Sequence, residues 1–526
     1  MWEPLTSPFA SLFLSSLIAF LPLLFLLLGL GWLKLPSYKV CFTSLVLTAV
    51  IALTAWQMPG VFVLQSVVEG VLTGFWPILW VIIAAMYTYN VTVETGGMDT
   101  IKATLAKISP DRRIQALILA FSFGGFLEAA AGFGTAVAIP ASLLAGIGFD
   151  PIFAAIICLV ANTVPVAFGG VGIPVITLAQ VAELNLAAVT ASIAYQLIIF
   201  IIILPFALVL LLTKSFKSLK DVLGACLVSG VLFALFQTIT AVYIGPEVAA
   251  IIGSLASLVG TIICVRIFPL DNIWLFPGES QATNKVNISI DADKSVGLAA
   301  AWMPYIVLFI LIMSINLIPS LKFLGKAPFA SSMQLYFGPG GKPATFQWLT
   351  TPGTLMLISA VIGGLAQKAS LEQLFSIFLR TIKQLLPTIG TVLSIVSMAK
   401  IMGYSGMISS IAIALASAAG PIYPFVAPLI GALGTFVTGS DTSSNILFGA
   451  LQKQVALQIG KDPVWIAAAN ATGASAGKMI SPQSIAIAAS ATGLEQHEGQ
   501  ILNSTLLYCL IYALLLGAEV LIVSLL

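Results

Sequence analysis

Long runs of apolar residues, separated by short polar segments, dominate this chain. A helix needs about 20 mostly apolar residues to cross the hydrocarbon core of a bilayer. We therefore predict a membrane-spanning helix within each of the runs 10–33, 40–56, 74–90, 186–213, 221–243, 248–267, 297–318, 352–367, 384–401 and 500–526. Two more regions, 113–182 and 422–493, are apolar but broken by Gly, Pro, Asn, Thr and Ser. Together these segments predict an all-α, polytopic membrane protein with about 12–14 membrane-crossing elements.

The composition excludes several classes of protein. Hydrophobic residues make up 59% of the 526 residues and charged residues 8%, whereas an average soluble domain has about 25% charged residues. So few charges exclude a soluble enzyme, a disordered chain and a nucleic-acid binder. Runs such as 12–33 show no alternation of apolar and polar residues, which excludes an outer-membrane β-barrel. The five cysteines have no CxxC spacing, so we expect no disulfide framework, metal site or cofactor.

The lysines and arginines of the short loops orient the chain, because cytoplasmic loops are enriched in these residues. If the predicted spans alternate, four groups fall on the cytoplasmic side and the N-terminus falls outside: Lys34 and Lys39; Lys102, Lys107, Arg112 and Arg113; Lys214, Lys217 and Lys220; Lys368, Arg380 and Lys383. Three lysines of the long loop 318–351 then lie on the opposite side, namely Lys322, Lys326 and Lys342. Long loops follow the rule less closely.

The two halves of the chain share a collinear series of short matches, 308–312 residues apart. The matched pairs are Pro77 and Pro387, Gly97 and Gly406, Gly124 and Gly434, Asp150 and Asp462, Asn162 and Asn470, and Pro174 and Pro482. The loop that precedes the first broken region contains Asp111, Arg112 and Arg113, whereas its counterpart, 418–424, has no charge. The difference predicts that the two loops face opposite sides of the membrane. Inverted-topology repeats of this kind are common in secondary transporters.

This repeat suggests five parts of the chain. We predict N-terminal transmembrane helices, a first transport repeat, a polar cytoplasmic linker, connecting helices with a long loop, and a second transport repeat, over residues 1–73, 74–268, 269–296, 297–383 and 384–526. Each repeat contains a re-entrant helical hairpin, near 124–145 and near 434–458, because non-helical backbone survives in a membrane only inside protein or beside a cavity. The predicted hairpin hinges are Gly132, Gly134, Gly439 and Gly477.

Several motifs of these broken regions resemble one known family. The segments GGFLEAAAGFGTAVAI, ANTVPVAFGGVGIP, TGSDTSSNILFGALQ and GKMISPQSIAIA, together with WPILWVIIAA near the start, are similar to those of the bacterial lactate permeases. Members of that family carry L-lactate, D-lactate or glycolate with a proton. The resemblance extends along nearly the whole chain and implies a proton symporter for small 2-hydroxy monocarboxylates in the bacterial inner membrane, and not an enzyme.

Two acidic residues within the broken segments are candidates for proton coupling. Glu128 lies in the first hairpin, and an ionisable side chain inside a membrane is a functional candidate by default. Asp441 lies in TGSDTSSN in the second hairpin. Either carboxylate could instead cap a helix or bind hairpin backbone. Glu69 and Glu94 fall near the ends of predicted spans, and we expect them at the membrane interface.

Lys478 is the candidate cation for a carboxylate substrate. It could equally neutralise Asp441 or Glu128 as an ion pair. The other candidate substrate-binding residues share amide or hydroxyl side chains and lie in the same broken segments, and they could instead satisfy unwound backbone: Asn162, Thr163, Ser440, Thr442, Ser443, Ser444, Asn445, Asn470, Gln483 and Ser484.

Two alternative functions remain open from the sequence. TGSDTSSN has the oxygen ligands that a hard cation prefers, which would suit sodium coupling. An intramembrane enzyme would need a nucleophile with a base or a metal motif. The single histidine, His497, falls in a polar loop away from the hairpins, so this function is disfavoured. The expected partners are a small carboxylate, a proton and membrane lipid, with no nucleic acid; homo-oligomer formation is left open.

Overall fold

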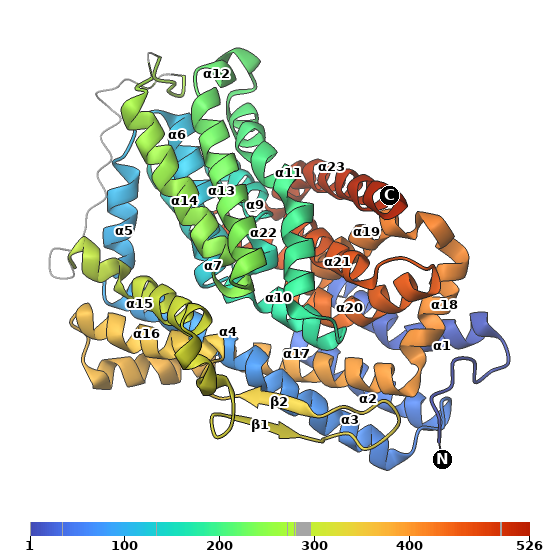
Figure 1. Ribbon diagram of the computed structural model, residues 1–526. Coiled ribbons are helices and arrows are strands. Elements are labelled where there is room, and N and C mark those ends of the chain that lie inside the picture. The colour runs from blue at the N-terminus through green and yellow to red at the C-terminus, as the bar shows by residue number, and fades with distance from the viewer. Residues whose placement is uncertain are drawn as a thin grey trace.

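The computed structural model describes residues 2–33, 35–132, 134–270, 272–277, 279, 296–494 and 497–526. These residues form an almost entirely helical body (Figure 1). Within them, eleven helical segments are long and apolar enough to cross a membrane, or twelve if the bent pair 151–161 and 166–181 forms one span. The all-α, multi-pass architecture is confirmed, with a number of candidate spans one below, or at the lower end of, the predicted 12–14. Most of the predicted linker, 269–296, lies outside the described residues.

A helical hairpin occupies the first broken region. Its first arm is a continuous helical segment made of α6 (Arg112–Ala116), η3 (Leu117–Phe123) and α7 (Gly124–Ala130). Its second arm is the shorter helix α8 (Thr135–Gly146). The chain turns at Gly132 and Gly134, whose φ angles of 63° and 84° lie in the left-handed region that glycine adopts without strain. The arms pack closely, since a Cβ at Gly124 would lie 3.4 Å from the carbonyl oxygen of Ala136.

A second hairpin occupies the second broken region. Its arms are α19 (Tyr423–Thr438) and α20 (Asp441–Gln458). Gly439 ends α19 with a φ of 72°, and the Ser440 hydroxyl caps α20 by accepting a 3.2 Å hydrogen bond from the Ser443 amide. Across the hairpin, the Ser444 hydroxyl donates to the Gly431 carbonyl at 2.9 Å. The Thr-Gly-Ser sequence thus ends one arm and begins the next.

A broken helix follows each hairpin. After the first come α9 (Pro151–Ala161), η4 (Val166–Phe168) and α10 (Gly169–Val181), and after the second come α21 (Pro463–Lys478) and α22 (Pro482–Ala491). Both α9 and α21 begin with Asp-Pro. The Asp150 carboxylate accepts from the Phe153 amide at 2.9 Å, and the Asp462 carboxylate accepts from the Val464 amide at 2.8 Å. The matched Asp-Pro pairs therefore mark equivalent helix starts.

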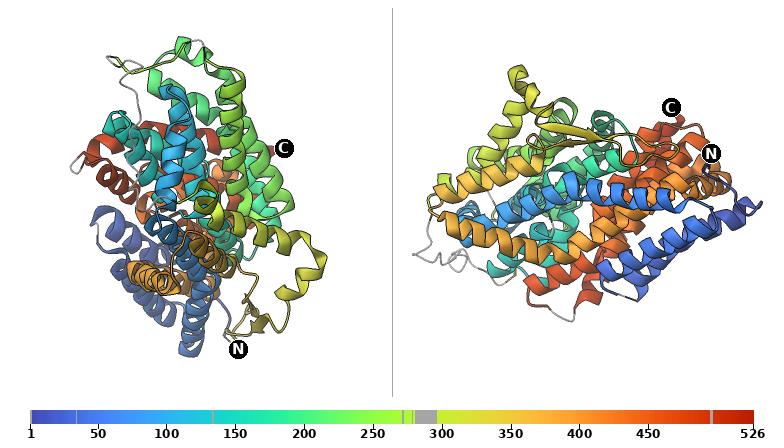
Figure 2. Two further views of the ribbon diagram at one scale, coloured as in Figure 1. Left: turned by 90° about the vertical axis from the view of Figure 1, so that its left-hand side faces the viewer. Right: turned by 90° about the horizontal axis from the view of Figure 1, so that it is seen from below.

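The remaining helices surround these central elements. They are α1 (Leu12–Leu27), η1 (Leu28–Trp32), α2 (Ser37–Thr54), α3 (Gly60–Thr73), η2 (Gly74–Leu79), α4 (Trp80–Glu94), α5 (Gly97–Ala106), α11 (Leu186–Thr213), α12 (Phe216–Lys220), α13 (Leu223–Tyr243), α14 (Pro246–Ile267), α15 (Leu298–Leu317), α16 (Pro352–Ala366), α17 (Leu371–Ser405), α18 (Met407–Ala419), η7 (Gly420–Ile422) and α23 (Glu498–Leu525). In Figure 2, α4, α16 and α17 run side by side across the molecule.

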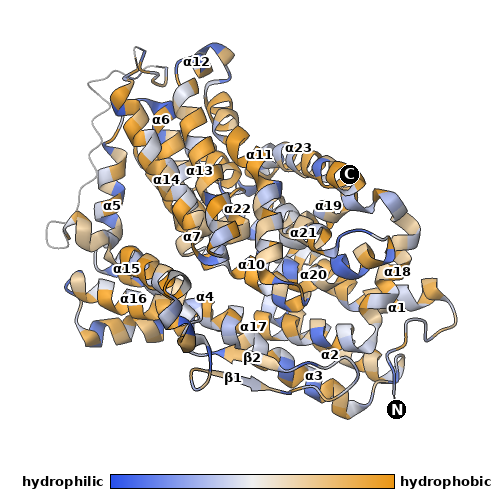
Figure 3. Ribbon diagram, viewed as in Figure 1, coloured by the Kyte–Doolittle hydropathy of each residue, from blue (hydrophilic) through white to orange (hydrophobic). Residues whose placement is uncertain are grey.

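The outer faces of these helices are apolar. In Figure 3 hydrophobic residues cover most of α11, α13 and α14, whereas hydrophilic residues gather in the loops and around α20. Large side chains such as Ile199, Leu235 and Ile263 are exposed on these outer faces. This distribution suits a body whose exterior is solvated by lipid and whose polar residues turn inward.

An ionic cluster joins the first hairpin to the segment that leads into the linker. The Arg112 guanidinium contacts both carboxylate oxygens of Glu279, at 2.6 and 3.1 Å, and this hydrogen bonding lowers the pKa of Glu279. Arg113 donates to the Ser218 and Asn272 carbonyls and pairs with Asp111. The start of α6, the helix α12 and the linker segment therefore contact one another at one end of the molecule.

The long loop 318–351 folds back onto the helices. It contains η6 (Pro319–Gly325) and an antiparallel pair, β1 (Ala330–Met333) and β2 (Ala344–Gln347), in which Ala330 pairs with Gln347. Tyr336 stacks on Tyr404 of α17, with ring centroids 3.8 Å apart.

Of the two glutamates predicted near the ends of spans, Glu69 is not exposed. That side chain is buried, and its carboxylate lies 2.6 Å from the Lys400 ammonium. The reason is tertiary: α3 packs against α17, which supplies the counter-charge. Glu94 is about one-third exposed, with 32% side-chain exposure, and pairs with Arg380.

Candidate functional site

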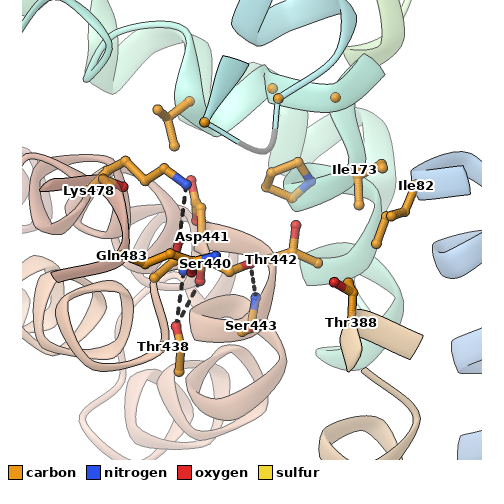
Figure 4. A pocket seen from close by; sticks show the side chains of 18 of the residues that line it. Ile82, Ile173, Thr388, Thr438, Ser440, Asp441, Thr442, Ser443, Lys478 and Gln483 are labelled. Carbon is orange, nitrogen blue, oxygen red and sulfur yellow. Dashed lines mark hydrogen bonds between the residues drawn. The ribbon is translucent and has the colours of Figure 1, made fainter. Parts of the chain in front are cut away.

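A central cavity of about 130 Å³ lies where the two hairpin turns meet (Figure 4). Its walls come from both hairpins, from the breaks that follow them, and from α2, α4 and α17. It is smaller than the roughly 300–1,000 Å³ of pockets that hold drug-sized ligands. The cavity therefore suits a small ligand.

Asp441 lines this cavity and is the first residue of α20. Its carboxylate accepts hydrogen bonds from the Asn445 amide at 3.1 Å and from the Ser475 hydroxyl at 3.5 Å. The side chain is buried, with 4% of its surface exposed. A helix N-terminus presents unpaired N–H groups and the positive end of the helix dipole, and both stabilise a negative charge there.

A chain of side-chain hydrogen bonds ends on this carboxylate. The Tyr423 hydroxyl donates to Gln452 at 2.8 Å, and the Gln452 amide donates to Asn470 at 3.1 Å. The Asn470 amide then donates to Asn445 at 2.9 Å, and Asn445 donates to Asp441. Every donor in this buried chain points toward Asp441. Aligned hydrogen bonds of this kind polarise one another, which strengthens the last one.

Glu128 lies on the opposite wall, in the last turn of α7. It is 4% exposed and accepts one side-chain hydrogen bond, from the Asn162 amide at 3.1 Å. Gly169 lies against it, since a Cβ there would come within 2.7 Å of Glu128 Oε1. Any side chain at that position would displace the carboxylate. The C-terminal end of a helix is the negative end of its dipole, so Glu128 and Asp441 occupy opposite electrostatic environments.

Lys478 reaches into the cavity from the last residue of α21. Its ammonium donates to the Gly439 carbonyl at 3.0 Å and is 9% exposed. It interacts electrostatically with both Glu128 and Asp441, yet it forms no ion pair with any carboxylate of the described residues. Lys478 was predicted either to bind the substrate or to pair with Asp441 or Glu128, and the structure does not show the direct ion pair. The ammonium is the one cation among the residues that line the cavity.

The structure brings many of the candidate residues together. Those that line the cavity are Glu128, Gly132, Gly134, Gly439, Ser440, Asp441, Thr442, Ser443, Lys478, Gln483 and Ser484. Asn162, Asn445 and Asn470 stand behind the cavity and bind its carboxylates or one another.

Three candidates fulfil backbone or packing roles instead. The Thr163 hydroxyl donates to the Val160 carbonyl, and Ser444 bridges the arms of its hairpin. Gly477 lies in the last turn of α21, directly before the break that leads to α22, and it packs against the Ala432 carbonyl.

Four hydroxyl residues that line the cavity were not predicted as site residues from the sequence: Ser37, Thr388, Thr391 and Thr438. Ser37 begins α2, and the two α17 threonines follow the Pro387 that matches Pro77 in the first half. That match was the one signal that could have pointed to α17. Hydroxyl side chains in an unbroken helix usually satisfy their own backbone, as the Thr391 bond to the Pro387 carbonyl does.

Comparison with known proteins identifies the family. The model of the L-lactate permease family matches residues 15–526, almost the whole chain. The chain belongs to this family. An L-lactate permease of Streptococcus iniae is 41% identical over 86% of this chain and 93% of its own length. The L-lactate permease of Salmonella typhi is 37% identical over 98% and 97%, and the glycolate permease GlcA of Escherichia coli K12 is 34% identical over 98% and 97%.

A solved structure shares the fold of this permease-family member. The MtrF protein of Neisseria gonorrhoeae superposes with a TM-score of 0.52 over 94% of this chain and 96% of its own, at 12% identity. Sequence identity this low shows the fold alone. Family membership and the apolar helices together make the chain a multi-pass membrane protein, and the resemblance drawn from its motifs is confirmed.

Proposed function

We propose that this protein is a proton-coupled symporter that imports lactate or glycolate across the bacterial plasma membrane. The observation that carries the proposal is Lys478, a buried ammonium that has no ion-pair partner among the described residues. It faces a small cavity between two buried carboxylates. A buried cation in this setting favours an anionic ligand. The lactate and glycolate permease names of its relatives supply the substrate class.

The cavity offers separate partners for the two ends of a 2-hydroxy acid. The substrate carboxylate would bind the Lys478 ammonium and the free backbone amides at the start of α20, where a helix N-terminus favours an anion. The substrate hydroxyl would bind side chains such as Thr442 and Gln483, which line the same cavity. The limited volume would exclude larger carboxylates.

Glu128 is the group that we expect to take up the coupled proton. Asp441 receives two side-chain hydrogen bonds at a helix N-terminus, and both stabilise its negative charge. Glu128 receives one, at the opposite end of a helix dipole. Protonation of Glu128 would remove one of the two buried negative charges that share the single Lys478 ammonium, so the loaded carrier could reorient. The empty carrier with Glu128 ionised would be held back by the desolvation cost of that charge.

The direct test is uptake into proteoliposomes with the two candidate gradients imposed separately. Labelled lactate and glycolate should accumulate when the outside is acidic, and an equal sodium gradient at constant pH should leave uptake at the background level. Accumulation driven by sodium alone would replace the proton with sodium as the coupling ion. Absence of uptake for both acids under both gradients would refute the proposal.

The transport repeats are proposed to be inverted, with the N-terminus outside. The breaks in 74–268 correspond to those in 384–526. Gly96 and Gly406, with φ angles of 79° and 97°, each precede a helix, and in both repeats a hairpin and then a broken helix follow that helix. Two such repeats could exchange conformations and so expose the cavity alternately to each side.

Cysteine labelling tests this orientation. Lys107 and Ala418 are exposed and lie at the ends of the matched helices before the two hairpins, Lys107 directly after α5 and Ala418 in the last turn of α18. Single cysteines there, in a Cys264→Ser background, should react with a membrane-impermeant thiol reagent from opposite faces, Lys107→Cys from the cytoplasm and Ala418→Cys from outside. Cys264 is replaced because the other four native cysteines are buried. Reaction of both from the same face would exclude inverted repeats.

A further inference from the structure

A second cavity, of about 360 Å³, lies at the end of the molecule that carries the N-terminal segment. Its walls come from that segment at Thr6, from the long loop at Pro339 and Gly340, and from α10, α17, α18 and α20. In the proposed orientation this end faces the outside. The loop closes over it through an ion pair, 2.6 Å long, between Lys342 and Glu183.

Charge in this cavity is unevenly compensated. Lys400 and Lys453 both line it. Lys400 is neutralised by Glu69 at 2.6 Å, whose carboxylate also accepts from the Tyr404 hydroxyl at 3.0 Å. Among the described residues, these contacts leave no unpaired charge on the α17 side of the cavity.

Lys453 of α20 has no such partner. Its ammonium donates to the backbone carbonyl of Glu183 at 3.4 Å and forms no ion pair with the carboxylates of the described chain. The Glu183 carboxylate is already bound to Lys342. Glu183 itself lines the cavity and also acts electrostatically on Lys453. Two lysines, Lys342 and Lys453, thus share one carboxylate, so one positive charge is left in excess among the described residues here.

The same helices line both cavities. On α10, Pro174 is the last residue that lines the central cavity and Val181 is the first that lines the second cavity. On α20, the last and first residues are Ser443 and Ala450. Seven helical residues span about 10 Å. Between them α20 and α10 touch, because a Cβ at Gly449 would lie only 2.5 Å from Leu178 Cδ1. On α10 and α20 an apolar contact about two turns long thus separates the two cavities, whereas on α17 the gap from Val392 to Val396 is about one turn.

We propose that the second cavity is an external waiting site for the carboxylate substrate, with Lys453 as its cation. The proposal rests on the proposed function, since it takes a small monocarboxylate as the ligand. The larger volume leaves room for an anion that is still hydrated, whereas the central cavity requires it to shed water. A net positive charge in a cleft raises the local concentration of anions. Opening of the contact between Leu178 and Gly449 would then admit the substrate to Lys478.

Thiol labelling inside the cavity tests the site without relying on transport. Ser409 of α18 lines the cavity, so Ser409→Cys in the Cys264→Ser background places one reactive thiol there. Added from outside, an anionic methanethiosulfonate should react at least about tenfold faster than a cationic one, the lower end of the effect of electrostatic steering. External lactate or glycolate should slow the reaction.

Lys453→Gln in the same background should abolish both the preference for the anionic reagent and the protection by substrate. Lys461→Gln is the matched control, because Lys461 donates to the Ser524 carbonyl and does not line the cavity. That variant should behave as the parent does. In transport, Lys453→Gln should raise the KM for external substrate about tenfold at an unchanged maximal rate, which is the mark of binding lost equally from the ground state and the transition state.

Three results would overturn the waiting site: no protection by either acid with Lys453 present, equal protection in Lys453→Gln, or labelling of Ser409→Cys only from the cytoplasm. A chain that shows protection but no lactate or glycolate uptake would support the site and refute the proposed function instead. The two failures are therefore distinguishable.

Discussion

Replacing Lys478 with methionine should abolish uptake of lactate and glycolate while the protein still inserts into the membrane. Lys478 and the carboxylate of the bound substrate would form a buried charge pair. Removing one partner of such a pair costs about 2–5 kcal/mol, which corresponds to at least about a thirtyfold loss of transport. Methionine keeps most of the volume of the side chain and removes its charge. Initial rates of uptake in proteoliposomes, normalised to the amount of folded protein in size-exclusion profiles, measure the effect.

Two variants separate charge from structure in this experiment. Lys478 donates to the Gly439 carbonyl at the hairpin turn, so its loss could loosen that turn. Lys478→Gln keeps an amide donor for the carbonyl without the charge and should be as inactive as the methionine variant. Lys461 donates to a backbone carbonyl in the same way but lies outside the cavity, so Lys461→Met should transport normally. Near-normal uptake with Lys478→Met would remove this residue from substrate binding.

Replacing Glu128 with glutamine should uncouple transport from the proton gradient. Glutamine mimics the protonated carboxyl group and can still accept from Asn162, whose amide lies 3.1 Å from Glu128. Counterflow of labelled against unlabelled lactate requires no net proton movement, so it should persist within about tenfold of the parent, a cost of about 1.4 kcal/mol. Accumulation of lactate driven by an inward proton gradient should disappear. Both assays use the same proteoliposomes.

Asp441→Asn is the matched variant in the facing hairpin. It keeps the shape of the side chain but removes the charge on which the chain of donors from Tyr423 through Asn445 converges. We expect it to lower uptake and counterflow together, because Asp441 organises the cavity wall beside Lys478. Persistent uphill accumulation by Glu128→Gln, combined with selective loss of accumulation in Asp441→Asn, would move the proton to Asp441.

Much of the fold could be predicted from local chemistry. Glycines at 132, 134 and 439 adopt left-handed φ angles and mark the hairpin turns. The Asp-Pro pairs begin helices, because the carboxylate caps the first turn and proline needs no amide partner there. Apolar runs of sufficient length predicted the spans. The start of α17 at Leu371 was missed, because its first turns contain Glu372 and Gln373 and reduce the local hydropathy.

The candidate site was predicted in part. Glu128, Asp441 and Lys478 stood out because charged residues are rare inside apolar segments, and each was chosen within its own broken segment. Their convergence on one cavity depends on how the two hairpins face each other. Asn445 and Asn470 resembled substrate ligands in the sequence, yet in the structure they bind Asp441 and one another. An asparagine that binds substrate and one that supports a carboxylate look the same in a sequence. Only the residues around it in the folded protein distinguish these two roles.

The sequence by itself determined which segments enter the membrane, where the backbone breaks, and to which family the chain belongs, because hydropathy, glycine and proline act through local geometry and the motifs are contiguous. Tertiary structure alone decided which charges are compensated. Glu69 of α3 meets Lys400 of α17, more than 300 residues away, whereas Lys478 and Lys453 face cavities without a carboxylate partner among the described residues. Coulombic energy depends on distance in space and on burial, and neither quantity is encoded in the spacing of residues along the chain.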